Sequence, residues 1–244
     1  MASRLALALA VLAGCADATA SGRAGSGSGP GSGSGSDAPS SRFEHDMLVR
    51  FHMHENFGLV RAIERLLLRG KLDEARELAH GIAIAPEEPG MTAWAAQATR
   101  VRERAAALAS AKTLDEALVA DAKLASECAS CHVASGVMPE FGSPPALPPD
   151  RPTVEARMTR HLWASERLWE GLVGGADDSW RAGLDVLALA PLPASQVGPD
   201  RAVFARNLQR LAETARKLRT NDHSAAYAEI LSTCVTCHTA KKGT

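Results

Sequence analysis

Two short stretches of the same pattern decide how the rest of this chain is interpreted: Cys128-Ala129-Ser130-Cys131-His132 and Cys234-Val235-Thr236-Cys237-His238. In each stretch two cysteines stand three positions apart, and a histidine directly follows the second cysteine. The C-x-x-C-H pattern is typical of covalent attachment of haem c. Two thiols at this spacing can add to the two vinyl groups of one porphyrin, and the adjacent imidazole can then reach the iron.

The pattern therefore predicts two haem c groups, each with its iron. We expect the four motif cysteines to be the thioether anchors, and the two histidines to be proximal iron ligands: Cys128, Cys131, Cys234 and Cys237, with His132 and His238. The alternatives are one structural zinc held by all four cysteines, or disulfides. Zinc sites do not need a histidine after the second cysteine in both copies, and these pairs lie farther apart than in zinc ribbons.

The first residues have the composition of a bacterial export signal. Arg4 precedes an apolar run, residues 5–12, which is too short to span a bilayer as a permanent helix. The run ends in Leu12-Ala13-Gly14-Cys15. This stretch resembles a lipobox, at which a lipoprotein signal is cut before the cysteine and that cysteine is lipidated.

We therefore expect a signal peptide over residues 1–14, a lipid anchor at Cys15, and a membrane-anchored lipoprotein in the periplasm or elsewhere outside the cytoplasm. The alternative is an ordinary secretory signal cut after Ala18 or Ala20, with Cys15 discarded. Both interpretations export the chain. Haem is attached to C-x-x-C-H motifs outside the cytoplasm, so the two lines of reasoning agree.

Residues 15–40 are predicted to form a tether. Residues 21–36 consist almost entirely of glycine and serine, which offer no apolar surface to bury and behave as a flexible coil. A coil of about 25 residues reaches roughly 25–30 Å on average. Such a tether would let a lipid-anchored electron carrier move between redox partners at a membrane surface; a spacer without this task is the alternative.

The rest of the chain repeats itself. Met53 and Met158 are 105 residues apart, as are Gly70 and Gly175, and the first cysteines of the two motifs are 106 apart. A period of this length indicates two copies of one structural unit. We place the units at residues 41–134 and 153–244, joined over residues 135–152 by a proline-rich stretch that we expect to be a semi-rigid, extended linker.

Both units are predicted to be helical, because strand signals are nearly absent and good helix formers abound. Capping-box patterns occur at Ser41-Arg42-Phe43-Glu44 and Thr113-Leu114-Asp115-Glu116. The expected helices are 42–69, 72–85, 92–111 and 114–132 in the first unit and 154–173, 178–190, 200–219 and 222–238 in the second. The predicted fold is all-α: two tandem four-helix bundles, each with one covalent haem near the end of its fourth helix.

Four antiparallel helices with C-x-x-C-H near the end of the last resemble the cytochrome c-prime family and its low-spin, six-coordinate relatives. In those relatives the sixth iron ligand is a methionine in the first helix. Met53 and Met158 match this place, since both lie seventeen residues ahead of a turn glycine. Packing in the core is the alternative for each methionine. His161, one helical turn after Met158, is an alternative sixth ligand, and the residue at the corresponding place in the first unit is Asn56.

These features predict a non-enzymatic dihaem electron carrier that cycles between Fe(II) and Fe(III) and exchanges electrons with redox partner proteins at a membrane surface. One alternative is a five-coordinate haem protein that binds nitric oxide or carbon monoxide, as the resemblance to cytochrome c-prime implies. A dihaem peroxidase is a further alternative, although its motifs come early in each domain. The formal net charge of −1 gives no indication of a nucleic-acid partner. His45, His80 and His223 are expected at the surface.

Overall fold

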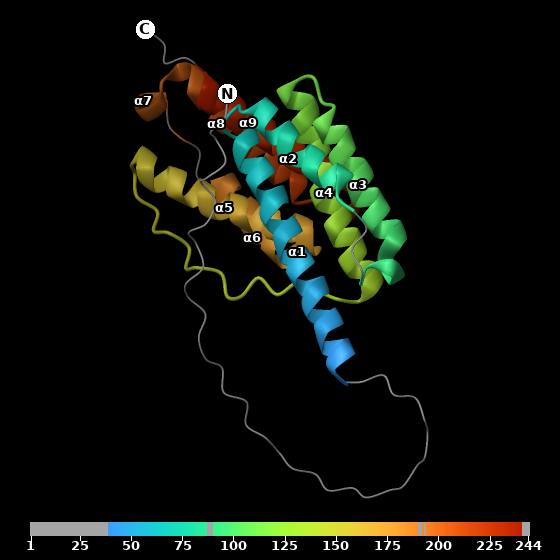
Figure 1. The fold of residues 1–244 in the computed structure, drawn as a ribbon. Coiled ribbons are helices and arrows are strands. Elements are labelled where there is room, and N and C mark those ends of the chain that lie inside the picture. The colour runs from blue at the N-terminus through green and yellow to red at the C-terminus, as the bar shows by residue number, and fades with distance from the viewer. Residues whose placement is uncertain (1–38, 87–89, 190–191, 193, 241–244) are drawn as a thin grey trace, which may run out of the picture. The chain divides into compact units, whose positions relative to one another are not determined.

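The computed structural model of this chain describes residues 39–86, 90–189, 192 and 194–240, and the side chains from residue 47 onward (Figure 1). The predicted signal peptide, Cys15 and nearly all of the predicted tether lie outside the described residues. Within the described part, every regular element is a helix and there is no strand. None of these helices is long and apolar enough to cross a membrane. The all-α prediction is therefore confirmed for the described residues.

The helices follow one another in chain order with short connections, apart from the longer stretch between α4 and α5. Their bounds are α1 (Pro39–Leu67), α2 (Leu72–Ile84), α3 (Ala95–Ala109), α4 (Leu114–Ser135), α5 (Val154–Gly174), α6 (Asp177–Leu189), α7 (Ala194–Val197), α8 (Pro199–Ala215) and α9 (His223–Thr239), with 3-10 turns at η1 (Thr92–Trp94) and η2 (Thr220–Asp222).

Several helix ends follow the local signals in the sequence. Thr113 caps α4 by accepting a hydrogen bond from the backbone N–H of Glu116 at 3.2 Å. Gly70 and Gly175 follow α1 and α5 with φ angles of 71° and 67°, a conformation that glycine adopts without steric cost. The capping box predicted at Ser41 is wrong, because α1 already begins at Pro39.

Other helix bounds differ modestly from the expected ones. α3 ends at Ala109 and α8 at Ala215, each earlier than predicted, and a 3-10 turn precedes α3. The short helix α7, Ala194–Val197, was not predicted. A single helical turn contains too few residues for the composition and capping signals from which the longer helices were predicted.

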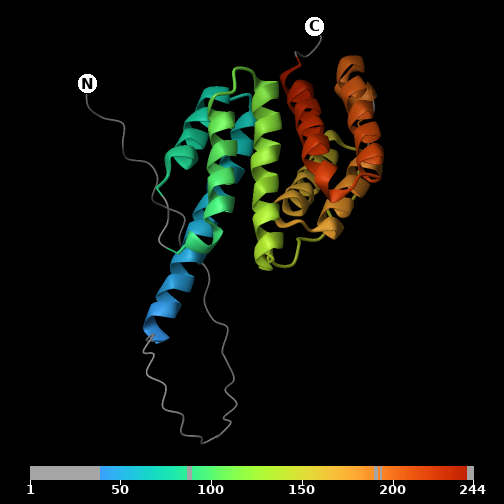
Figure 2. The same ribbon diagram turned by 90° about the vertical axis from the view of Figure 1, so that its right-hand side faces the viewer.

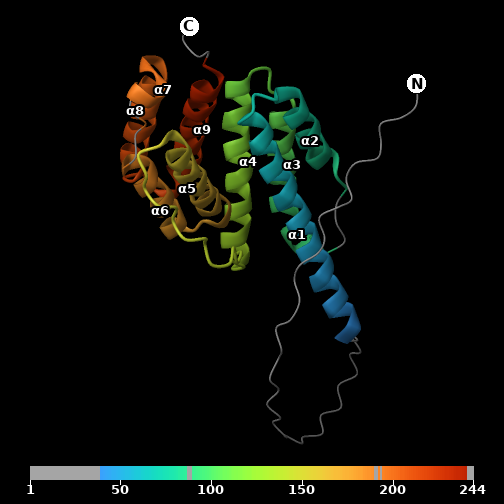
Figure 3. The same ribbon diagram turned by 90° about the vertical axis from the view of Figure 1, so that its left-hand side faces the viewer.

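The first four long helices contact one another in sequence, and α1 also contacts α4. In the C-terminal part, α5 contacts α6, α6 contacts α8, and α8 contacts α9. Figures 2 and 3 show α4 standing between α1–α3 on one side and α5–α9 on the other. We call α1–α4 the first half of the helical unit and α5–α9 the second half. α4 packs against both α5 and α9, so it forms the interface between the two halves.

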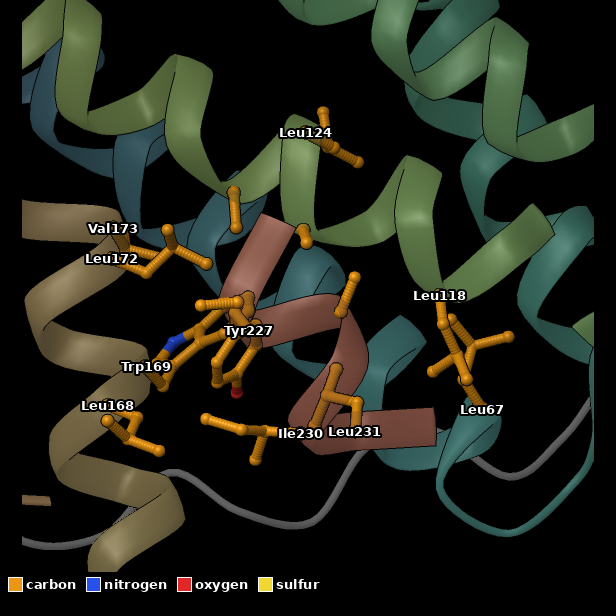
Figure 4. Packing of buried hydrophobic residues seen from close by; sticks show 14 of the residues in the cluster. Leu67, Leu118, Leu124, Leu168, Trp169, Leu172, Val173, Tyr227, Ile230 and Leu231 are labelled. Atoms are coloured by element: carbon orange, nitrogen blue, oxygen red, sulfur yellow. The ribbon is translucent and has the colours of Figure 1, made fainter. Parts of the chain in front are cut away.

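The two halves share one hydrophobic core, which differs from the expectation of two lobes held on a stiff joint. The described residues between 39 and 240 form a single compact unit. Figure 4 shows part of the core, where Trp169 of α5 and Tyr227 of α9 lie close together; their ring centroids are 6.4 Å apart. The helix faces that the sequence marks as apolar therefore pack across the two halves as well as within each.

Equivalent positions of the two halves meet at this interface. Arg61 of α1 forms an ion pair with Glu166 of α5, and these residues are 105 positions apart, which is the repeat offset. The ion pair therefore joins corresponding helices, α1 and α5, of the two copies of the repeat.

The proline-rich stretch runs along the second half and is fastened to it. The backbone carbonyl oxygen of Pro148 accepts a hydrogen bond from Arg160 at 2.6 Å. That of Pro145 accepts one from the indole N–H of Trp163 at 2.8 Å. Phe141 lies against Phe57 of α1, with ring centroids 6.1 Å apart. This stretch has no helix, as predicted, and its contacts hold it in place between the halves.

The close approach of α5 and α6 depends on glycine. A Cβ added at Gly183 of α6 would lie 2.7 Å from the backbone oxygen of Ala164, so Gly183→Ala is expected to lower the free energy of unfolding by about 1–3 kcal/mol. Gly81 in α2 is the matched control, because a Cβ there meets nothing within 4 Å. Gly81→Ala is expected to raise stability by up to about 1 kcal/mol. Urea denaturation measures the free energy of unfolding of both variants. Changes of the same sign in the two variants would contradict the close packing of α5 and α6.

Candidate haem sites

The second motif lies on α9 and faces residues of α5. Cys234, Cys237 and His238 stand at positions i, i+3 and i+4, which share one face of a helix. They line one cavity together with Met158 and His161 of α5. The other residues around this cavity are Leu192, Phe204, Ala205, Leu208 and Thr233. The structure thus brings a predicted proximal ligand and both candidate sixth ligands of one haem to the same cavity.

The donor set around this cavity fits a haem c. It supplies two thiols for the vinyl groups, an imidazole next to them, a thioether and a second imidazole across the cavity, and a mainly apolar wall. The cavity has a volume of about 30 Å³, which has room for only a few water molecules and not for a porphyrin. Covalent attachment of a haem therefore requires the side chains that line the cavity to move outward.

The first motif occupies the last turns of α4 in a similar environment. Burial raises the pKa of Cys128 to about 12, and the nearby Cys131 adds to this effect. In the second motif burial likewise raises the pKa of Cys234 to about 12, with a further contribution from Cys237. In both motifs, then, the two cysteines are half-buried, and the raised pKa favours a neutral first thiol. The cysteines of the two motifs have matching surroundings, as the internal repeat predicts.

A cationic side chain lies near the second cysteine of each motif. Burial raises the pKa of Cys131 while the charge of Arg100 opposes this, and Arg201 does the same for Cys237. Arg201 also donates a hydrogen bond to the backbone oxygen of Ala240 at 2.8 Å. The two cations occupy corresponding helices, α3 and α8. They place positive charge near the second cysteine of each motif.

His132 has the properties expected of an iron ligand. It is half-buried at the end of α4, and its Nδ1 is buried without a hydrogen-bond partner. Burial lowers its pKa, although a hydrogen bond with the backbone of Val173 acts in the opposite direction. A lowered pKa favours the neutral imidazole, which is the form that coordinates a metal. His238, its counterpart, is exposed.

The structure places the candidate sixth ligand of the first site less directly. Met53 is half-buried on α1, and α1 packs against α4, which carries the first motif. Asn56 corresponds to His161. The Nδ2 atom of Asn56 lies 2.8 Å from Nε2 of His52. The position of Met53 is compatible with its predicted role, whereas Met158 already shares a cavity with its motif.

The four motif cysteines do not gather into one site. Each pair lies on its own helix, and all four are free thiols. Among the described residues there is no group of three or more His, Cys, Asp or Glu side chains placed to hold a metal ion. This arrangement does not support the alternative of one zinc bound by four cysteines.

In comparisons with protein-family models, with curated proteins and with solved structures, nothing matches this chain. The candidate sites are therefore argued from the residues and from their geometry.

The sequence did not predict a buried polar cluster between the two motifs. It comprises Arg61 and Glu64 of α1, Asp121 of α4 and Tyr227 of α9, which are all at most 7% exposed. Arg61 pairs with Glu64, and the Tyr227 hydroxyl donates a hydrogen bond to Glu64. One signal was available: Asp121 and Tyr227 each stand seven residues before the first cysteine of a motif, so they are equivalent positions of the repeat.

The prediction that His223 lies at the surface is wrong. His223 is 4% exposed and stacks on Trp180, with ring centroids 4.2 Å apart and an interplanar angle of 11°. Burial lowers its pKa, although the nearby Asp177 carboxylate acts in the opposite direction. Its position at the start of α9 points it into the core, which sequence spacing alone could not indicate. His80 is exposed, as predicted, and His45 lies outside the residues whose side chains are described.

Proposed function

We propose that this chain is a dihaem c-type cytochrome that carries electrons outside the cytoplasm, built as two tandem four-helix bundles that resemble cytochrome c-prime and its low-spin relatives. The observation that supports this most directly is the cavity lined by Cys234, Cys237 and His238 on one side and by Met158 and His161 on the other. Cysteines and histidine on one helix face, with a ligand-bearing residue opposite, are what a covalently held, six-coordinate haem requires.

The proposed roles of the residues follow from their places. Cys128 and Cys131 would anchor one haem and Cys234 and Cys237 the other, with His132 and His238 as proximal ligands. Met53 would be the sixth ligand in the first site, and Met158 or His161 in the second. The haem itself would supply one-electron exchange between Fe(II) and Fe(III).

The protein would contribute ligand positions, exclusion of water and a tuned electrostatic environment. The first cysteines would hold each porphyrin against apolar helix faces, and Arg100 and Arg201 would supply positive charge near the second cysteines. We further propose export through residues 1–14 and anchoring at Cys15, which would keep the carrier at a membrane surface beside its redox partners.

The experiment that tests this proposal is an optical and low-temperature electron paramagnetic resonance study of the haem-loaded chain. We expect low-spin iron in the unmodified protein. Met158→Ala is expected to turn one haem high-spin if the methionine is the ligand, and His161→Ala if the histidine is. Met53→Ala tests the first site in the same way, and Met138→Ala is the matched control, because Met138 is 53% exposed.

The main competing function is binding of nitric oxide or carbon monoxide at a five-coordinate iron. It predicts high-spin iron in the unmodified protein, no change on substitution of Met53, Met158 or His161, and ready binding of carbon monoxide. That set of results would replace electron transfer by gas binding. A chain that carries no covalent haem at all would overturn both functions.

A further inference from the structure

The buried polar cluster at the interface between the halves contains a carboxyl group without a hydrogen-bond partner. Asp121 of α4 is completely buried, and both of its carboxylate oxygens lack a partner among the described residues. Buried polar groups are normally hydrogen-bonded, so one that is not calls for an explanation. An ionised carboxylate without partners in a protein interior costs several kcal/mol, and the group avoids this cost by holding a proton.

We propose that Asp121 is a proton-binding site whose protonation is linked to reduction of the two haems, so that the chain takes up a proton when it takes up electrons. The inference rests on the proposed function, because it needs haem groups at both motifs. It assigns to the interface between the halves a role that neither haem motif has by itself.

The cluster stands between the two motifs. Asp121 is close enough to Cys128 to help raise the pKa of that thiol. Asp121 and Cys234 both help to raise the pKa of Tyr227. Asp121 precedes Cys128, and Tyr227 precedes Cys234, by two turns of the same helix. A charge change at a haem held by either motif would therefore act on this cluster through a low-dielectric interior.

The charges that face Asp121 make it the group able to respond. From α1, Arg61 attracts its carboxylate, but Arg61 is already paired with Glu64 and with Glu166 of α5. From α9, Tyr227 donates its hydroxyl proton to Glu64 and not to Asp121. On the α3 side, Arg100 and Arg104 pair with Glu127 at the surface. Glu64 thus has two partners, and Asp121 retains none.

Asp121 gains or loses its proton at a pH not far above neutral. Burial raises its pKa to about 8, although the Arg61 charge acts in the opposite direction. A group with this pKa changes its protonation near neutral pH. An electron that arrives from a redox partner adds one negative charge, and a proton from solvent that binds the Asp121 carboxylate cancels it. The linkage is reciprocal: protonation of Asp121 must favour reduction as much as reduction favours protonation.

The test is the pH dependence of the haem reduction potentials, measured by spectroelectrochemical titration of the haem-loaded full chain between pH 6 and pH 9. Because Asp121 already holds its proton well below pH 8, we expect the potentials to be nearly constant there and to fall as pH rises above about 8. The change in the reduction equilibrium should then be up to tenfold per pH unit, which is 59 mV for one electron. Asp121→Asn is expected to remove most of this slope. Asp115→Asn is the matched control on α4, because Asp115 is exposed.

A second measurement does not depend on electron transfer. Because the folded-state pKa of Asp121 is raised from 3.8 to about 8, its contribution to stability is greatest below pH 4 and is lost as pH rises toward 8. The unfolding equilibrium constant of the unmodified chain should rise by up to tenfold per pH unit in this window. Asp121→Asn should not show this rise, and Asp121→Leu serves as a second non-titrating variant.

The outcomes separate this inference from the proposed function. Haems that attach and cycle with potentials independent of pH, or with the same slope in Asp121→Asn as in the unmodified chain, would overturn the proton-binding role and leave the cytochrome assignment intact. Absence of covalent haem would overturn both. A slope that is lost in Asp121→Asn and kept in Asp115→Asn would support the inference.

Discussion

Replacement of Cys234 and Cys237 by alanine is expected to leave the chain with one covalently bound haem where the unmodified chain has two. The reason is chemical: each thioether needs a cysteine sulfur, and the two cysteines that serve the second site lie on α9, away from those of the first. The same pair of substitutions at Cys128 and Cys131 is expected to remove the other haem. Replacement of all four should abolish covalent haem.

The measurement is the mass of the intact, denatured protein together with its haem absorbance per chain after export and maturation. Thr236→Ala is the matched control, because Thr236 is an exposed residue inside the second motif that takes no part in the attachment chemistry. It should keep both haems. If the cysteine pairs instead served one shared zinc, removal of either pair would abolish all metal binding, and no variant would carry haem.

Arg61→Met is expected to lower the free energy of unfolding by about 3–5 kcal/mol, which is the usual cost of breaking a buried ion pair by removing one partner. The Glu64 carboxylate is completely buried, and Arg61 neutralises it while also pairing with Glu166. The Arg61 guanidinium further lies 5.1 Å from the centroid of the Trp169 ring. Its loss therefore leaves a buried charge and removes a contact between the halves.

The matched control is Arg65→Met, one turn further along α1. The Arg65 side chain is 61% exposed and lies 3.8 Å from the same Glu166 oxygen, so its removal is expected to cost no more than about 1 kcal/mol. Guanidinium chloride denaturation of the haem-loaded chain measures both variants. Equal costs for Arg61→Met and Arg65→Met would show that the buried cluster does not stabilise the interface between the halves.

A third variant checks the cause of the expected loss. Glu64→Gln added to Arg61→Met removes the uncompensated charge, while the glutamine can still accept the hydrogen bond from Tyr227. The double variant should therefore be more stable than Arg61→Met alone. A double variant that is as unstable as Arg61→Met, or less stable, would point to lost packing on Trp169 as the main effect.

The local elements of this protein follow from the sequence. The abundance of good helix formers indicated the long helices, Thr113 marked the start of α4, and Gly70 and Gly175 marked turns after α1 and α5. The two C-x-x-C-H motifs supply the predicted haem anchors and proximal ligands, which stay predictions. The helix and turn predictions succeed because helix propensity and capping depend on residues that are close together in the chain.

The candidate sixth ligands could be selected from the sequence only in part, because their final positions also depend on tertiary packing. The repeat offset selected Met158 and the helical spacing added His161, and both line the cavity at the second motif. The sequence could not rank them, because residues three positions apart lie on the same helix face. The positions of both relative to His238 depend on how α5 packs against α8 and α9.

The sequence by itself determined that the chain is helical, that it carries a repeat with a period of about 105 residues, and which cysteines and histidines form the two C-x-x-C-H motifs. Only the tertiary structure decided that the halves share one core, that Arg61 meets Glu166, and that Asp121 is buried without a partner between the motifs. The physical reason is that an apolar period shows which face of a helix is buried, whereas the partner that covers this face is set by packing between residues far apart in the chain.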